Sequence, residues 1–134
     1  MEDCVFCKIA QGGEQASHIY EDRDVTAFLD TRPVNEGHTL VIPKKHYENI
    51  FEIPDEELAN LFKVVKKVAA AIMKSEKAEG IRIIQNNGSA ANQIIFHLHV
   101  HIIPQNEGQE LHRPRETLGQ SELERVAAKI RKFV

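Results

Sequence analysis

The 134-residue sequence lacks the features of several large protein classes. Its formal net charge is only −3, from 17 basic and 20 acidic residues, so no basic field attracts a polyanion and we expect no nucleic-acid partner. Its longest uninterrupted apolar run, residues 68–73, is far shorter than the roughly 20 residues of a membrane-spanning helix. The chain starts with acidic residues rather than the basic and then apolar segments of a secretory signal. We therefore expect a cytoplasmic protein without a membrane segment.

Cysteine is also scarce, since Cys4 and Cys7 are the only two. They are too close in the sequence for a disulfide between them to stabilise a fold, and the cytosol keeps thiols reduced. A C-x-x-C pair can supply two thiolates to one zinc ion, at about 2.3 Å from each sulfur. The alternative is a pair of ordinary buried thiols. A closed zinc site needs two further ligands, and the sequence contains seven histidines.

What the sequence does contain is apolar material for one core, because 42% of its residues are hydrophobic in a chain of single-domain size. Strand patterns occur at residues 19–20, 25–29, 38–42, 81–85 and 94–103. These strands do not alternate regularly with helices. We therefore expect an α+β fold with a five-stranded, mostly antiparallel sheet.

Three segments have helical patterns. Residues 4–11 predict a short helical turn, and an apolar stripe with a period of 3.6 predicts a long amphipathic helix that begins after Pro54. A final helix is predicted from Ser121 to near Phe133, because Ser121 and Glu124 have the spacing of a capping box. The expected fold thus has one long helix and a C-terminal helix on the sheet.

Three of the seven histidines alternate with apolar residues, in the run His97-Leu98-His99-Val100-His101. Successive side chains of a strand point to opposite faces, so the three imidazoles are expected on one face and the apolar residues in the core. Alternate residues of a strand lie about 6 to 7 Å apart, so one small metal ion cannot bind all three and their roles must differ.

A row of imidazoles suits phosphoryl chemistry. A neutral imidazole is a nucleophile toward phosphorus and, near neutral pH, a proton donor or acceptor for an oxygen. Two other interpretations are open: the polar face of an edge strand, and a metal site that uses two histidines of the row. His38 lies at the start of the central strand and is expected to meet the row across the sheet as a hydrogen-bond partner, whereas His18 and His112 are expected on the surface.

The motif H-L-H-V-H-I-I resembles the His-φ-His-φ-His-φ-φ signature of the histidine triad (HIT) family. Residues 6–9 resemble the opening turn of that family, residues 27–30 its ribose-binding segment and residues 37–46 its central block. The resemblance covers residues 4–104 and is greatest to the Hint branch, which consists of purine nucleotide-binding homodimers that hydrolyse nucleoside phosphoramidates and aminoacyl adenylates.

The resemblance implies a HIT-like fold and a purine nucleotide-binding nucleotidyl hydrolase or transferase that forms a homodimer. With it we expect a HIT domain over residues 1–104 and a C-terminal extension, a polar connector plus a helix, over residues 105–134.

The resemblance also assigns roles to individual residues. His99 matches the nucleophile that attacks the α-phosphorus and becomes transiently nucleotidylated, after which water releases the nucleoside monophosphate. His101 matches a residue that contacts the phosphate oxygens, and His97 is the first catalytic-triad histidine. Asp30 matches the carboxylate that holds the ribose hydroxyls.

Further nucleotide contacts follow from the same resemblance. Asn86 and Gln93 match polar side chains near the α-phosphate, and the backbone N–H groups between them are expected to form an anion cradle. The base pocket is expected to have apolar walls: Val5, Phe6, Ile9 and Phe28. Without the resemblance, these four would be interpreted as ordinary core residues.

The resemblance implies the two missing zinc ligands. Several bacterial HIT proteins, and the related galactose-1-phosphate uridylyltransferases, combine a C-x-x-C pair with the histidine that ends the central block and the first triad histidine. The implied structural zinc site is therefore Cys4, Cys7, His46 and His97. A zinc ion there would tie the N-terminal turn to the catalytic strand and remove His97 from proton transfer.

The sequence departs from the Hint pattern at one single residue and at one pair of residues. Ile94 stands where a Ser or Thr is common, so a hydroxyl beside the leaving group is missing. Ala91 and Asn92 stand where a glycine-rich pair is frequent. Two alternative functions are therefore kept: a dinucleoside polyphosphate hydrolase, as in the Fhit branch, and a nucleotide-binding regulatory protein whose catalysis is vestigial.

Overall fold

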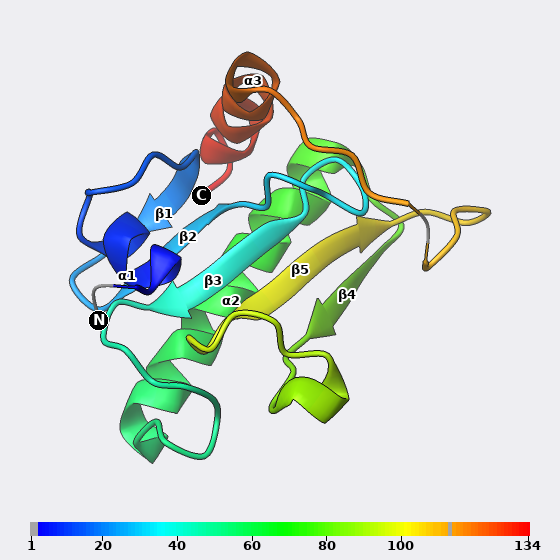
Figure 1. The fold of residues 1–134 in the computed structure, drawn as a ribbon. Helices are drawn as coiled ribbons and strands as arrows, with labels where there is room; N and C mark the ends of the chain where they lie inside the picture. Colours follow the sequence, from blue (N-terminus) through cyan, green and yellow to red (C-terminus); the bar gives the residue numbers. More distant parts are fainter. Residues whose placement is uncertain (1–2, 113) are drawn as a thin grey trace.

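The computed structural model describes residues 3–112 and 114–134, and within them a five-stranded sheet forms the middle layer (Figure 1). Its strands are β1 (His18–Glu21), β2 (Val25–Leu29), β3 (Thr39–Pro43), β4 (Gly80–Ile84) and β5 (Val100–Gln105). They lie in the order β1-β2-β3-β5-β4, and every neighbouring pair is antiparallel. The predicted α+β class is confirmed. The first two residues of the acidic N-terminal segment lie outside the described residues.

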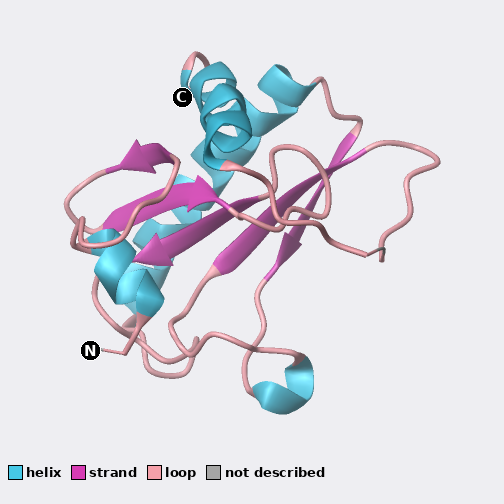
Figure 2. Ribbon diagram, turned by 45° about the horizontal axis from the view of Figure 1, so that its top comes forward, coloured by secondary structure: helices cyan, strands magenta, loops and turns pink. Residues whose placement is uncertain are grey.

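Helices cover both faces of this sheet. The long helix α2 (Asp55–Glu76) runs behind it, α3 (Gln120–Arg131) packs beside α2 near β1, and the short helix α1 (Val5–Ala10) lies in front (Figures 1 and 2). A 3-10 turn, η1 (Ser89–Ala91), follows β4. Among the described residues, no helix is both long and apolar enough to cross a membrane.

Each face of the sheet has its own apolar cluster. On β3, Val41 packs under α2, whereas Leu40 and Ile42 pack under α1, as expected when side chains alternate. The larger cluster is completed by the apolar stripes of α2 and α3, including Leu61, Val65, Val68, Ile72, Leu123, Val126 and Ile130. The smaller cluster contains Phe6, Ile9 and Phe28 beside Leu40 and Ile42. This smaller cluster forms the floor of the candidate site.

The last strand is shorter than predicted. The sequence predicted a strand over residues 94–103, but β5 begins only at Val100. The N–H group of Leu98 donates to the carbonyl oxygen of Tyr47 at 2.7 Å, so this segment bonds to a loop rather than to a strand. The alternation of faces nevertheless continues upstream of the strand, because Leu98 is fully buried in the larger cluster while the rings of His99 and His101 contact each other.

Helix α2 begins at Asp55, directly after Pro54 as predicted, whereas α3 spans Gln120–Arg131 rather than Ser121 to near Phe133. Gly119 precedes α3 without any side-chain cap, so the predicted capping box is wrong: Ser121 lies inside the helix and Glu124 pairs with Arg131. Helix α2 ends at Glu76 and is capped by Lys77, whose φ of 51° is left-handed and whose N–H group donates to the carbonyl oxygen of Met73. The predicted existence of both helices is confirmed.

Candidate active site

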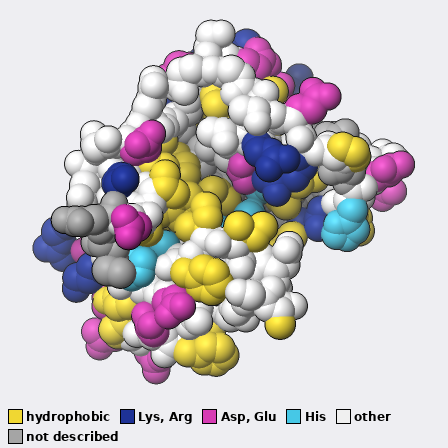
Figure 3. All heavy atoms as spheres, viewed as in Figure 1, with side chains coloured by type: hydrophobic (Ala, Val, Ile, Leu, Met, Phe, Trp, Pro, Cys, Tyr) yellow, Lys and Arg dark blue, Asp and Glu magenta, His cyan; other side chains and the backbone are white. Residues whose placement is uncertain are grey.

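A cavity of about 350 Å³ opens on the α1 face of the sheet. Figure 3 shows a hollow on this face with hydrophobic walls, a histidine at its floor and charged side chains at its rim. Most residues that the sequence assigned to a nucleotide site line this cavity: Val5, Phe6, Ile9, Phe28, Asp30, Asn86, His99 and His101. Gln93 and His97 do not line it.

His99 presents one ring nitrogen with a free lone pair. Its Nδ1 lies 2.7 Å from the carbonyl oxygen of His97, so Nδ1–H is the donor and Nε2 is the unprotonated atom. The ring also packs edge-on against Phe6, with the ring centres 5.2 Å apart. Burial lowers the pKa of His99, which keeps the ring neutral near pH 7. A neutral Nε2 is the form of imidazole that can attack an electrophile.

His101 is held in the opposite tautomer through His38. The N–H group of Val34 donates to His38 Nδ1 at 3.0 Å, so the proton of His38 is on Nε2. That Nε2–H donates to His101 Nδ1 at 3.0 Å, which leaves the proton of a neutral His101 on its own Nε2. The predicted contact between His38 and the histidine row is confirmed. His101 is therefore a hydrogen-bond donor toward the cavity side.

Burial makes these two rings hard to protonate. It lowers the pKa of His38 to about 2 and that of His101 to about 4, and the positive charge of Arg115 acts in the same direction on both. The tautomers derived from the hydrogen bonds therefore hold at neutral pH.

Asp30 is held by two donors at the cavity wall. Its Oδ1 accepts the N–H group of Arg32 at 2.8 Å, and its Oδ2 accepts Nη2 of Arg115 at 2.7 Å. The atoms of Asp30, His38 and His101 are close enough to hold a metal ion. Asp30 already binds the guanidinium of Arg115, and the two imidazoles are hydrogen-bonded to each other. These three residues therefore fit a hydrogen-bond network better than a metal site.

The loop between β4 and the histidine row differs from the expected anion cradle. The N–H groups of Gly88, Ala91, Asn92 and Gln93 all donate to acceptors within the loop. These four N–H groups are therefore already hydrogen-bonded, and the prediction that they form a backbone cradle for an anion is wrong. The side chain of Gln93 is buried and donates to the carbonyl oxygens of Glu48 and Ile95, so it braces the loop rather than lining the cavity.

Three residues of this loop line the cavity besides Asn86: Asn92, Ile94 and Ile95. Asn92 lines it and has a φ of 71°, the left-handed conformation that glycine adopts more easily. Ile94 also lines it and is 78% exposed, so an apolar side chain stands at its mouth.

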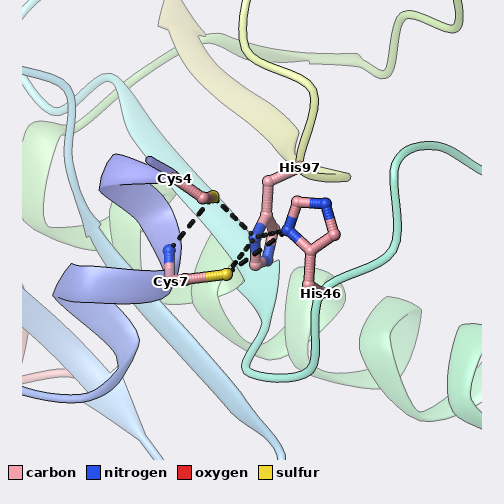
Figure 4. A group of neighbouring side chains, drawn as sticks. All are labelled: Cys4, Cys7, His46 and His97. Carbon is pink, nitrogen blue, oxygen red and sulfur yellow. Dashed lines mark hydrogen bonds between the residues drawn. The ribbon is translucent and has the colours of Figure 1, made fainter. Parts of the chain in front are cut away.

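Cys4, Cys7, His46 and His97 converge on one point beside the cavity (Figure 4). The two cysteines come from the start of α1, His46 from the loop after β3, and His97 from the segment before β5. Nε2–H of His97 donates to the carbonyl oxygen of Pro43 at 2.8 Å, which leaves the lone pair of Nδ1 for the cluster. Burial raises the pKa of Cys7 and lowers that of His97 to about 4.

The spacing of these four ligand atoms fits tetrahedral zinc. His97 Nδ1 lies 3.3 Å from Cys4 Sγ, 3.4 Å from Cys7 Sγ and 3.2 Å from His46 Nδ1. Cys7 Sγ lies 3.3 Å from His46 Nδ1. Tetrahedral zinc with Zn–N near 2.05 Å and Zn–S near 2.3 Å places two nitrogens about 3.3 Å apart and a nitrogen about 3.6 Å from a sulfur. Two thiols and two imidazoles are also ligands that zinc prefers, so these residues could hold a metal ion.

The model of the HIT domain family matches residues 11–108 of the chain. The chain belongs to the HIT family. An uncharacterized HIT-like protein of Methanocaldococcus jannaschii is 51% identical over 105 residues, covering 78% of this chain and 81% of that protein. An adenylylsulfatase of Arabidopsis thaliana is 43% identical over 78% of this chain and 53% of its own length. An adenosine 5′-monophosphoramidase of Candida albicans is 37% identical over 78% of this chain and 71% of its own.

Solved HIT structures agree with the fold. A Hit-like protein of Bartonella henselae superposes with a TM-score of 0.95 and 40% identity, covering 100% of this chain and 98% of that one. A zinc-bound HIT family protein of Mycobacterium smegmatis superposes with a TM-score of 0.88 and 36% identity, covering 98% and 92%. The predicted membership in this family and its fold are thereby confirmed.

Sequence reasoning missed several residues that line the cavity: Leu29, Thr31, Arg32, Leu40, Ile95 and Arg115. Of these, Arg115 binds Asp30, which is 85 residues away in the sequence. A single basic residue in a polar connector carries no sequence signal that separates it from a solvated surface charge.

Proposed function

We propose that the protein is a purine nucleotide-binding nucleotidyl hydrolase or transferase, of the phosphoramidate or acyl-adenylate type, that acts through a nucleotidyl-His99 intermediate. The observation that carries the proposal is the orientation of His99, whose Nδ1–H donates to the carbonyl oxygen of His97 at 2.7 Å. The unprotonated Nε2 belongs to a residue that lines the apolar cavity. Relatives named adenylylsulfatase and adenosine 5′-monophosphoramidase support the same reaction class.

The reaction has two displacement steps at the α-phosphorus. Nε2 of His99 forms a bond to phosphorus while the bond to the leaving group breaks, and the leaving group takes a proton from solvent. Nε2–H of His101 donates to a phosphate oxygen and stabilises the charge that develops there. Water then attacks phosphorus and releases a proton to solvent, the N–P bond breaks, and the nucleoside monophosphate leaves with neutral His99 restored. Asp30 holds the ribose, and Phe6, Ile9 and Phe28 enclose the base.

The cysteine–histidine cluster has a structural role in this proposal. Cys4, Cys7, His46 and His97 would hold a zinc ion, which supplies a cross-link between α1 and the segment that carries the nucleophile. His97 also places its carbonyl oxygen on Nδ1 of His99. It thus orients the nucleophile through its backbone while its ring belongs to the cluster.

Turnover of adenosine 5′-phosphoramidate, with release of AMP, tests the proposed function. The same assay with an aminoacyl adenylate and a dinucleoside polyphosphate compares the leaving groups. We expect the first two to be cleaved faster than the polyphosphate. Preference for the polyphosphate would support the Fhit-type alternative, and nucleotide binding without turnover of any of the three would support the regulatory one.

Ile94→Ser is expected to raise kcat/KM for a phosphoramidate about tenfold, or about 1.4 kcal/mol. An amine needs a proton on nitrogen as it leaves, and a hydroxyl at the cavity mouth can hydrogen-bond to that atom, whereas Ile94 cannot. A carboxylate leaves without much proton assistance, so an acyl adenylate of the same nucleoside should gain less. Equal responses of the two substrates would show that Ile94 only packs.

We also propose a homodimer that forms through the edge of the sheet. β4 is an edge strand, and with α2 it borders an apolar groove that includes Phe62, Met73, Ile81 and Ile83. Ile83 is 49% exposed, although it lies on a strand whose outer backbone edge can pair with another copy. A second copy of this chain would cover both the groove and the edge.

Ile83→Lys is therefore expected to convert a dimer into a monomer at micromolar concentration, because it places a charge in the apolar contact. Light scattering after size-exclusion chromatography measures the mass of each form. Leu111→Lys is the matched control, since Leu111 is similarly exposed but lies outside the groove. A wild-type monomer, or an Ile83→Lys dimer, would reject this interface.

A further inference from the structure

The connector between β5 and α3 runs along the segment that follows β2 (Figure 1). The N–H group of Leu118 donates to the carbonyl oxygen of Thr31 at 2.9 Å. Nε of Arg115 donates to the carbonyl oxygen of Arg32, and Nη2 of Arg32 donates to the carbonyl oxygen of Arg115 at 3.5 Å. The connector is therefore fastened beside Asp30 by backbone and side-chain bonds, although it lies beyond the part of the chain that the HIT domain model matches.

Arg115 extends from this connector into the wall of the cavity. Its Nη2 donates to Asp30 Oδ2 at 2.7 Å, in an ion pair whose side chains are 34% and 14% exposed. The same cavity contains His99 and His101. Arg115 is thus fixed on two sides, by the backbone of Arg32 through Nε and by the carboxylate through Nη2.

The two bonds to Asp30 approach different oxygens. The N–H group of Arg32 takes one lone pair of Oδ1, and Arg115 takes one lone pair of Oδ2. A carboxylate has about four lone-pair sites, so about one acceptor site remains on each oxygen. Two adjacent acceptors match the two neighbouring hydroxyls of a ribose. A carboxylate held by Arg32 alone would be free to rotate about its last bond.

We propose that Arg115 is a positioning residue for ribose recognition, which fixes the Asp30 carboxylate so that its two remaining acceptor sites face the 2′- and 3′-hydroxyls. The C-terminal connector is then part of the nucleotide site. This inference rests on the proposed function, in which Asp30 accepts hydrogen bonds from the ribose. It adds a residue from outside the matched domain that controls discrimination between a ribose and a sugar without hydroxyls.

Calorimetric titration with AMP and with 2′,3′-dideoxy-AMP tests the inference. The ratio of the two dissociation constants measures ribose recognition, and we expect it to be on the order of 100 in the wild type, because two bonds to a charged acceptor are lost. Arg115→Met should lower the ratio to about 10 or less while the dissociation constant of dideoxy-AMP changes by less than about twofold. Arg115→Lys should restore part of the ratio, since an ammonium can still bind Asp30.

Arg82→Met is the matched control. Arg82 donates to the carbonyl oxygen of Leu111 at 3.0 Å and so also holds the connector, but it does not line the cavity. We expect this variant to keep the wild-type ratio. A purely structural role of Arg115 would weaken both ligands equally, and that result would overturn the inference.

Other outcomes separate this inference from the function on which it rests. An unchanged ratio in Arg115→Met, or tighter AMP binding because Arg115 had blocked the ribose position, would overturn the inference and leave nucleotide binding intact. A wild type that binds both nucleotides equally would remove Asp30 and Arg115 from ribose recognition. A wild type that binds neither would reject the proposed function as well.

Discussion

His99→Ala is expected to lower kcat by more than about 100-fold, or about 2.7 kcal/mol, while nucleotide affinity stays within about threefold. Two of the described histidines, His99 and His101, line the cavity, and the unprotonated Nδ1 of His101 already accepts a hydrogen bond from His38. The variant therefore removes the one unprotonated imidazole nitrogen of this pair that has no hydrogen-bond donor. The base walls and Asp30 remain in place, so binding should survive. The loss of the covalent route must appear in kcat rather than in the dissociation constant.

Steady-state turnover and calorimetric binding of AMP measure the two effects separately. His112→Ala is the control, because His112 is an exposed histidine that does not line the cavity. It should match the wild type in both measurements. If His99→Ala keeps more than about one hundredth of the wild-type kcat, His99 is not the nucleophile.

Cys4→Ser is expected to lower the melting temperature by about 10 °C. A site filled at about 1,000 times its dissociation constant stabilises the folded chain by about 4 kcal/mol. For a domain of this size each kcal/mol corresponds to about 3 °C. The cluster joins α1 to two segments that are 39 and 90 or more residues away, so its loss also frees α1 from the cavity wall.

Metal analysis and thermal unfolding check this prediction on protein purified without chelator. The wild type should contain about one zinc per chain, and Cys4→Ser much less. His112→Gln removes a histidine outside the cluster and should change neither value. A wild type without metal that melts at the same temperature with and without added zinc would reject the site.

The alternation of the histidine row between the two faces of the sheet could be predicted from the sequence, but the length of its strand could not. Alternation of faces depends only on extended backbone, and Leu98 is accordingly buried opposite His99. The extent of a strand depends on which partner its N–H groups meet. Here the carbonyl oxygen of Tyr47, a loop residue, takes the N–H group of Leu98.

Some side chains of the site could likewise be predicted from the sequence, and others could not. Cys4, Cys7 and His46 stand in short motifs that resemble those of known proteins, and the structure brings them to His97 as that resemblance implied. Arg115 belongs to no motif and reaches Asp30 only because the connector packs beside β2.

The loop before the row shows a further limit of the sequence. The resemblance implied a backbone cradle for an anion between Asn86 and Gln93. Four of its N–H groups donate within the loop instead: that of Gly88 to Oε1 of Gln93 at 2.8 Å, and those of Ala91, Asn92 and Gln93 to backbone carbonyl oxygens. Small size leaves a backbone accessible, but the local hydrogen bonds determine whether its donors are free.

Direct detection of the covalent intermediate tests the central claim. The protein is mixed with adenosine 5′-phosphoramidate, quenched without acid during the first turnover, and analysed by intact mass and peptide mapping. The account predicts a transient gain of one adenylyl group, located on His99 and absent from His99→Ala. Turnover with no adduct at any quench time, or an adduct on another residue, would contradict it.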